Sequence, residues 1–315
     1  MSMIEAMAGR RRGAAVEWPT VAVAAGLYLA FGLLTWHHHA LPWWLVLPMG
    51  GYLVCLHGSL QHEVVHGHPT RIAWVNEAFV FPSLWLWLPF RIYRESHLTH
   101  HRDDRLTCPL EDPESNYLSP DIWQAMGPAA RLFRRAIGTI AGRLIMGPPF
   151  YVGRLAVNEI DRLTKGDRSH LVAWALHVSG VGMVLLWAVG VCAIPLEEYI
   201  LLYAYPGLAL TVLRSYCEHR AVPRVGERTA IVEAGPALSL MYLNNNLHAV
   251  HHAKASLAWY KLPALYRERR AEFLAGNAGY VFPGYWQIVA RYLLVPKEPT
   301  PHPFLGRPTQ PAKAA

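Results

Sequence analysis

The chain has 315 residues, of which 53% are hydrophobic and only 16% are charged. Soluble domains usually carry about 25% charged residues, so this deficit, together with 12 tryptophans and 15 tyrosines, argues against a soluble protein and favours a membrane protein with an interfacial aromatic belt. The net charge of +7 does not predict a nucleic-acid partner, because the basic residues flank apolar segments and do not interleave with an exposed aromatic face.

Four apolar stretches are long enough to cross a bilayer, which takes roughly 17–25 residues per helix. The expected spans are residues 19–36, 42–61, 170–193 and 197–214. Short connections at 37–39 and 195–198 would join them into two hairpins. A fifth apolar segment, 78–90, is shorter and contains Pro82 and Pro89, so we expect it to be embedded or re-entrant and not to span the membrane.

The remaining segments divide the chain into three parts. Residues 1–18 form an N-terminal flank, 19–295 form one membrane domain, and 296–315 form a proline-rich tail that we expect to be mobile. Within the membrane domain, residues 129–156 could form one amphipathic helix at the level of the lipid headgroups. The predicted fold class is all-α: four transmembrane helices in two hairpins, with a cytoplasmic helical cap.

The uneven distribution of basic residues predicts the orientation of the chain. Residues 1–18 contain 3 Lys and Arg, 62–170 contain 13 and 214–315 contain 13, which accounts for all 29. Neither short connection between spans carries any. Because cytoplasmic segments of membrane proteins are enriched in Lys and Arg, we expect these three segments, and the cap with them, on the cytoplasmic side.

Three clusters of histidines lie in these segments or at their junctions with the spans. Their sequences are His62-Glu-Val-Val-His66, His97-Leu-Thr-His100-His101 and His248-Ala-Val-His251-His252. Residues three and four apart share a helix face, so the imidazoles of one cluster can face one another. Neutral imidazole binds iron, copper and zinc, and the eight imidazoles exceed the four ligands of one tetrahedral zinc. The pattern therefore predicts two metal ions.

Other histidines are weaker candidates. His219 follows Glu218 at the end of the fourth span, at a depth similar to His62; we expect it to be a ninth ligand, the alternative being a surface histidine beside a basic loop. His68 lies just past the expected helix end and is a further candidate. His57 could face the site or merely pack within the second span. No metal role is expected for His37, His38, His39, His170, His177 and His302.

Polar residues beside the clusters could orient the ligands. Ligand histidines usually donate their second ring N–H to a carboxylate or carbonyl oxygen, which fixes the tautomer and the ring orientation. The candidates for this role are Glu63, Asp104, Glu218 and Asn245. Adjacent helical residues point to different faces, so each of them could equally be a solvated surface residue. No catalytic side chain is expected beyond the metal ligands.

The first cluster also matches the H-E-x-x-H signature of zinc metalloproteases, with Glu63 as general base. One zinc site would leave the other two clusters unexplained, and the longer metzincin extension does not follow. A zinc intramembrane protease is therefore a distant alternative.

Together, the clusters and their positions relative to the spans resemble the membrane fatty acid desaturase superfamily over residues 20–290. A His-x-x-x-His follows the second span, a His-x-x-His-His comes about thirty residues later, and another follows the fourth span. Glu218-His219 resembles the extra ligand that this family places between the second and third clusters. The resemblance implies a non-haem site with two Fe ions, which uses O2 to remove hydrogen from an unactivated C–H bond.

This resemblance implies an O2-dependent oxidoreductase, and we expect a fatty-acyl lipid desaturase. The alternative within the family is a hydroxylase or ketolase that acts on a carotenoid or another small substrate. Trp85 and Trp87 could wall an apolar substrate tunnel. No His-Pro-Gly-Gly sequence of a fused cytochrome b5 is present, so a separate ferredoxin with its reductase is the expected electron donor. The size resembles small bacterial members, which implies the bacterial inner membrane.

Overall fold

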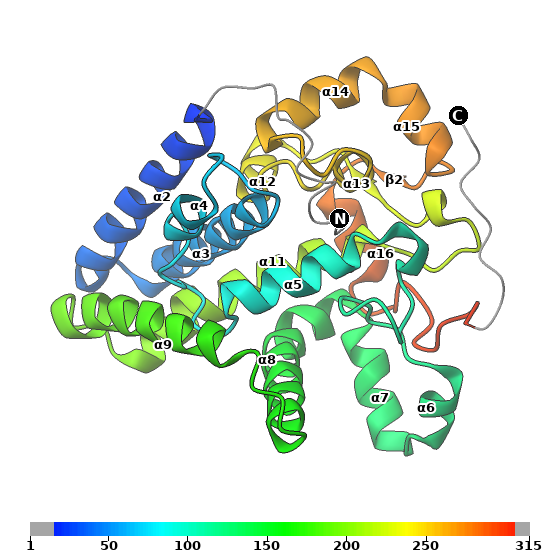
Figure 1. Cartoon of the computed structure of the whole chain (residues 1–315), viewed down its shortest axis with the longest axis horizontal. Helices are drawn as coiled ribbons and strands as arrows, with labels where there is room; N and C mark the ends of the chain where they lie inside the picture. Colours follow the sequence, from blue (N-terminus) through cyan, green and yellow to red (C-terminus); the bar gives the residue numbers. More distant parts are fainter. Residues whose placement is uncertain (1–15, 306–315) are drawn as a thin grey trace.

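The computed structural model describes residues 16–305 and consists mostly of helices (Figure 1). The predicted N-terminal flank lies almost entirely outside the described residues. Within these residues, four helical segments are long and apolar enough to cross a membrane, which agrees with the predicted number of spans. They are α2 (Trp18–Trp36), α3 (Trp43–Val65), α9 (Leu171–Leu185) with a π-helical continuation to Val191, and α10 (Leu196–Tyr199) leading through a π-helical turn into α11 (Tyr205–Glu218).

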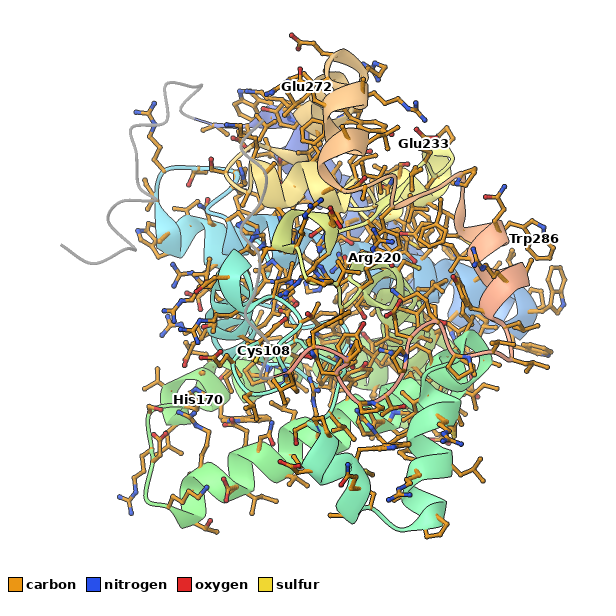
Figure 2. All side chains as sticks on the ribbon, turned by 90° about the vertical axis from the view of Figure 1, so that its right-hand side faces the viewer. Cys108, His170, Arg220, Glu233, Glu272 and Trp286 are labelled. Atoms are coloured by element: carbon orange, nitrogen blue, oxygen red, sulfur yellow. The ribbon has the colours of Figure 1, made fainter. Side chains whose placement is uncertain are left out.

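Large apolar side chains on these helices point outward. A soluble protein would bury them, but a lipid environment makes their exposure favourable. Examples with more than half of their surface exposed are Leu29, Leu33, Trp36, Trp43, Trp44, Val178, Met183, Leu186 and Leu201. Trp286, which is 77% exposed, projects from α16 (Tyr285–Tyr292) in the same manner (Figure 2).

The second and fourth spans continue further than the sequence predicted. Helix α3 runs to Val65 and not to residue 61, and α11 runs to Glu218 and not to residue 214. The sequence interpretation ended both spans where polar residues begin. In the structure these polar residues are buried inside the protein, His62 at 1% and Glu218 at 7% exposure, so the helices continue into the functional site.

Glycines bring α3 and α11 close together. An added Cβ at Gly207 would lie 2.4 Å from Val54 Cγ1, and one at Gly51 would lie 2.9 Å from Pro206 Cβ. Small residues permit such close approach of membrane helices, which packing interactions then stabilise. The two helices that end at the site are thus held tightly against each other.

Replacing Gly207 by alanine is expected to destabilise this contact. The new methyl group would overlap the stiff, branched side chain of Val54, and such overpacking costs about 1–3 kcal/mol. Thermal unfolding in detergent should therefore begin at a lower temperature. The matched control is Gly32→Ala in α2, where an added Cβ meets nothing within 4 Å. Equal melting temperatures for the two variants would contradict the proposed close packing.

The segment 79–89 is irregular and buried. Val80, Leu84 and Trp85 belong to the core between the spans. Tyrosine hydroxyls donate hydrogen bonds to two of its backbone carbonyl groups. Tyr199 donates to the Leu84 carbonyl at 2.7 Å, and another tyrosine donates to the carbonyl of residue 79. Non-helical backbone is tolerated at membrane depth when it is buried in protein, as here. This agrees with the expectation of an embedded segment.

The predicted single amphipathic helix over 129–156 was wrong. The structure has two helices, α7 (Pro128–Ile137) and α8 (Ile140–Thr164), separated by Gly138 and Thr139. Thr139 caps α8 by accepting a hydrogen bond from the Gly142 N–H at 3.0 Å. The chain changes direction between the two helices, because the first ends at a glycine and the second begins with a threonine cap. The periodicity of apolar residues did not reveal this break.

The remaining elements are shorter than the spans and include α5 (Phe90–His100). They include two strands paired in parallel, β1 (Ile231–Val232) and β2 (Val281–Phe282). The other helices are α4 (Ala73–Ala78), α6 (Pro120–Ala125), α12 (Pro236–Met241), α13 (His248–Ala253), α14 (Leu262–Glu268) and α15 (Arg270–Gly276). In Figure 1, α2, α3 and α9 gather at one end of the molecule, and α13–α16 at the other.

The tail from residue 296, for which the sequence predicts mobility, is packed as far as residue 305, where the described part ends. Lys297 Nζ lies 2.6 Å from the carbonyl oxygen of His219. His302 is 6% exposed, and its Nε2 lies 3.2 Å from Thr107 Oγ1. This part of the tail thus braces the segments that follow α5 and α11.

Candidate metal centre

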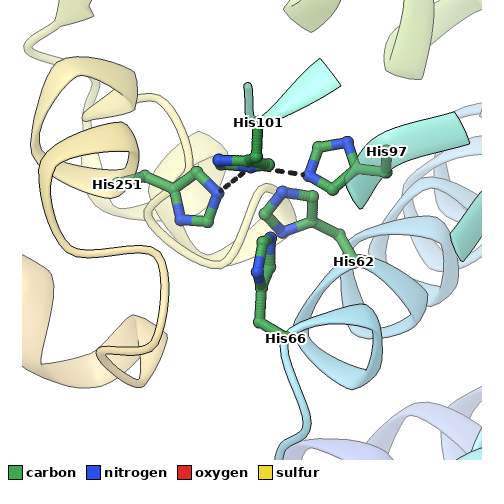
Figure 3. A group of neighbouring side chains, drawn as sticks. All are labelled: His62, His66, His97, His101 and His251. Atoms are coloured by element: carbon green, nitrogen blue, oxygen red, sulfur yellow. Dashed lines mark hydrogen bonds between the residues drawn. The ribbon is translucent and has the colours of Figure 1, made fainter. Parts of the chain in front are cut away.

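Nine histidine side chains converge in two groups, each with ring nitrogens within 4.8 Å of one another. The larger group, shown in Figure 3, consists of His62, His66, His97, His101 and His251. The smaller group consists of His100, His219, His248 and His252. These are the histidines that the sequence singled out as ligands, apart from His68.

Helix geometry explains how the histidines divide between the groups. Successive residues of an α-helix are rotated by about 100°, so residues i and i+4 diverge by about 40°, whereas i+3 lies about 100° from i+4. His97 and His101 accordingly share the larger group, while His100 belongs to the smaller one. The third cluster divides in the same way, with its middle histidine in the other group. Two of the three sequence clusters therefore serve both groups.

In the larger group, rings from α3, α5 and α13 approach one another. His62 lies in the last turn of α3 and His66 directly follows that helix. His97 lies in the last turn of α5 and His101 follows it. The Nε2 atom of His101 lies 3.0 Å from that of His97 and 3.1 Å from that of His251 (Figure 3).

The smaller group is equally close. The Nε2 atom of His219 lies 3.0 Å from that of His100 and 3.0 Å from that of His248, and His252 Nε2 lies 3.2 Å from His248 Nε2. Two nitrogens that bind one ion at about 2.1 Å lie about 3.0–3.4 Å apart, depending on the coordination angle. The spacing of the nitrogens therefore fits a metal ion in each group.

Hydrogen bonds on the far side of two imidazole rings direct the lone pairs of their other nitrogens toward these sites. Nδ1 of His97 lies 3.0 Å from Glu114 Oε1, and Nδ1 of His100 lies 2.9 Å from Asp112 Oδ1. Because an ionised carboxylate can only accept, Nδ1 carries the proton in both rings. In the neutral ring Nε2 then has a free lone pair, which is what a metal ligand requires.

Burial and neighbouring charges shift the pKa of several of these imidazoles. Burial, and then the charge that neighbouring histidines would carry, lowers the pKa well below its usual value at His101, His219, His248 and His251. At His100 burial also acts to lower the pKa, but Glu114 and Asp112 outweigh it and raise the pKa to about 9. Burial acts to raise the pKa of Glu114, but His97 and His100 hold it well below its usual range.

A cavity of about 640 Å³ adjoins the smaller group, and His100 and His219 form part of its wall. This volume is within the range of about 300–1,000 Å³ that is typical of small-molecule sites. Trp85 and Trp87 also line it, as does Gly58 of α3. The cavity therefore extends from the smaller histidine group toward the membrane-spanning helices.

A family model described as fatty acid desaturase matches residues 35–284, a range that includes both histidine groups. The chain belongs to this family. No curated protein matches the chain significantly.

In this desaturase family member, the carboxylates that orient the histidines are Asp112 and Glu114, which sequence reasoning missed. The prediction for Asp104 was wrong: its side chain is 71% exposed and lies 3.0 Å from Arg105. Asp104 lies in a single 3-10 turn on the surface. The chain returns to the histidines of α5 only later, at Asp112 and Glu114. The acidic sequence Glu-Asp-Pro-Glu at 111–114 could have suggested these residues. Its spacing from the histidine clusters, however, gave no reason to connect it with them.

The other predicted orienting residues are buried near the histidines. Asn245 Oδ1 lies 3.0 Å from His248 Nδ1, and Glu218 Oε1 lies 3.5 Å from the same nitrogen. Glu218 also forms an ion pair with Arg214 at 2.9 Å. Glu63 is 3% exposed and accepts a hydrogen bond from the backbone N–H of residue 259 at 3.2 Å. Asn245 and Glu218 therefore face the smaller group.

The remaining histidines of the described chain lie outside both groups. Nδ1 of His68 lies 2.7 Å from Glu17 Oε2, so this residue joins the start of α2 to the end of α3. His57 is fully buried in α3, next to the ring of Tyr28. The others are His37, His38, His39, His170, His177 and His302.

Proposed function

We propose that this protein is a membrane-bound di-iron oxygenase that desaturates a fatty-acyl lipid. The observation that carries the proposal is the convergence of nine histidines into two groups, one of which borders a cavity large enough for a substrate. In the proposal these histidines hold two Fe ions, five of them at one ion and four at the other. Imidazole nitrogen is a suitable donor for iron, and zinc would supply no redox chemistry.

When bound, iron would supply the oxidation chemistry: O2, two electrons and two protons would combine with two hydrogens from adjacent carbons, so that both oxygen atoms leave as water. The chain's own residues have simpler tasks. Asp112 and Glu114 hold His100 and His97 in the ligating tautomer. The cavity wall beside His100 and His219 would place the alkyl carbons next to the metal centre and exclude bulk water.

The proposed location is the bacterial inner membrane, with the metal centre on the cytoplasmic side. This orientation is supported by the absence of Lys and Arg from the connections 37–42 and 192–195, on the side away from the histidine groups. The electrons would come from a separate donor such as a ferredoxin with its reductase. A net charge of +7 suits an acidic donor of this kind.

A second candidate is a hydroxylase or ketolase of the same family, acting on a small substrate. One observation favours it: much of the cavity wall is polar or charged, and an acyl chain alone would not need such a wall. The zinc protease alternative has less support. His62 and His66 share a group with three further histidines, and Glu63 is engaged with backbone.

Metal and product analysis test this proposal. Protein purified without oxygen is expected to hold about two iron ions per chain, as five- and four-histidine groups would allow. Mass spectrometry of lipids from cells with and without the gene should then reveal a product that lacks two hydrogens. A product that gains one oxygen would favour the hydroxylase. A single zinc per chain would overturn both candidates.

A further inference from the structure

The acidic and basic residues of the cavity wall differ in how they are paired. The acidic side chains are all engaged, for example Glu114 with His97, Glu218 with Arg214 and Glu298 with a tyrosine hydroxyl. Each acidic side chain of the wall therefore already has a partner within the protein.

Within the described residues, three arginines of the same wall donate hydrogen bonds only to uncharged oxygens. Arg134 donates to the carbonyl of Asn116 at 2.8 Å, and Arg154 donates to two carbonyls of the segment 113–115 at 3.3 Å each. Arg143 donates to a carbonyl at 3.2 Å and contacts a tyrosine hydroxyl. The arginine ion pairs found within residues 16–305 involve other arginines.

These arginines also lie near one another. Arg143 and Arg154, both on α8, flank the ring of Tyr151 with their guanidinium carbons 5.6 and 5.3 Å from its centre. Burial lowers the pKa of Arg134; Tyr151 acts to raise this pKa, whereas the charges of Arg154 and Arg143 act to lower it further. The Nε atom of Arg134 is buried without a hydrogen-bond partner. Three positive charges that repel one another inside a cavity would be stabilised by a bound anion.

Another part of the wall is apolar. Trp85, Trp87, Leu88 and Leu208 belong to the spans or to the buried segment between them. Helices α7 and α8, which carry the arginines, lie apart from α3 in Figure 1. One cavity therefore joins an apolar region, a metal centre and a cationic region.

We propose that the substrate of this cavity is an amphiphile with an anionic end, a phosphate or carboxylate, bound by Arg134, Arg143 and Arg154. This inference rests on the proposed oxygenase function and adds a substrate class to it. The planar guanidinium group donates two parallel hydrogen bonds to phosphate or carboxylate, which makes arginine well suited to such an end group. The anion could be the headgroup of a membrane phospholipid or part of a soluble acyl carrier thioester.

Binding measurements on the iron-loaded protein, made without turnover, test this inference. Dissociation constants would be compared in an uncharged detergent for stearoyl-coenzyme A, dioleoylphosphatidylglycerol and uncharged methyl stearate. At least one anionic probe is expected to bind about tenfold or more tightly than methyl stearate. The tighter anionic probe identifies the source of the anion. Equal affinities for all three would overturn the inference.

The double variant Arg134→Gln with Arg154→Gln should lose this preference while it keeps its iron and its affinity for methyl stearate. A variant with lysine at both positions should retain part of the preference for an anionic probe. The matched control is Arg135→Gln, an exposed neighbour on α7 outside the cavity wall, which should behave as the unaltered protein. A preference that persists in the double variant would refute the assignment.

If the double variant does not fold, the single variant Arg154→Gln is tested for the same loss of preference for an anionic probe. This variant is expected to fold, because the Arg154 side chain contacts backbone carbonyls and a ring. Retained lipid oxidation without any preference for an anion would overturn this inference alone. Absence of iron and of an oxidised product would overturn the proposed function.

Discussion

The His100→Ala variant is expected to lose turnover and to bind about half as much iron as the unaltered protein. His100 Nε2 lies 3.0 Å from His219 Nε2 in the smaller group, and its Nδ1 pairs with Asp112. Its removal leaves three histidines there, and the buried Asp112 carboxylate loses its histidine partner. The larger group shares no residue with this site, so its ion should remain. Iron analysis and product formation by the purified protein measure the two effects.

The control for this experiment is His37→Ala. His37 is exposed and lies outside both groups, so iron content and turnover should not change. Thermal unfolding of both variants separates loss of metal from loss of fold. If His100→Ala retained two irons and formed product at the normal rate, the smaller group would not be a metal site.

Much of the fold follows from the sequence because long apolar helices are local features. Length and composition located the four spans, but not the ends of α3 and α11. Those ends depend on tertiary burial: His62 and Glu218 extend the helices because other parts of the chain cover them. The break between α7 and α8 was missed for a related reason, since apolar periodicity continues through Gly138 while the chain direction changes.

Eight of the nine histidines could be identified from the sequence because their spacing on helices is local, and His219 because it follows the fourth span. Their division into two groups could not, because it depends on which neighbouring helix each ring faces. His100 and His219 are 119 residues apart, yet their Nε2 atoms lie 3.0 Å apart. The orienting carboxylates were missed because proximity in sequence favoured Asp104, whereas the return of the chain brings Asp112 and Glu114 to the rings.

The Asp112→Asn variant is expected to lower iron affinity or activity by about 10- to 100-fold, as is usual for partners of metal-bound histidines. Asp112 Oδ1 pairs with His100 Nδ1 at 2.9 Å, and its Oδ2 accepts a hydrogen bond from the Thr107 N–H at 2.8 Å. An asparagine has only one oxygen. If that oxygen faces His100, the amide NH2 opposes the N–H of Thr107, and a buried donor is left unpaired.

If the amide is reversed, its NH2 faces His100 and Nδ1 must accept. The ring proton then moves to Nε2, which can no longer bind a metal. Either orientation weakens the site, and titration of iron into the metal-free variant measures the loss. Asp104→Asn is the matched control, because that side chain is 71% exposed and pairs with Arg105. Equal losses in the two variants would mean that negative charge near the site matters, and not the hydrogen bond that fixes the tautomer of His100.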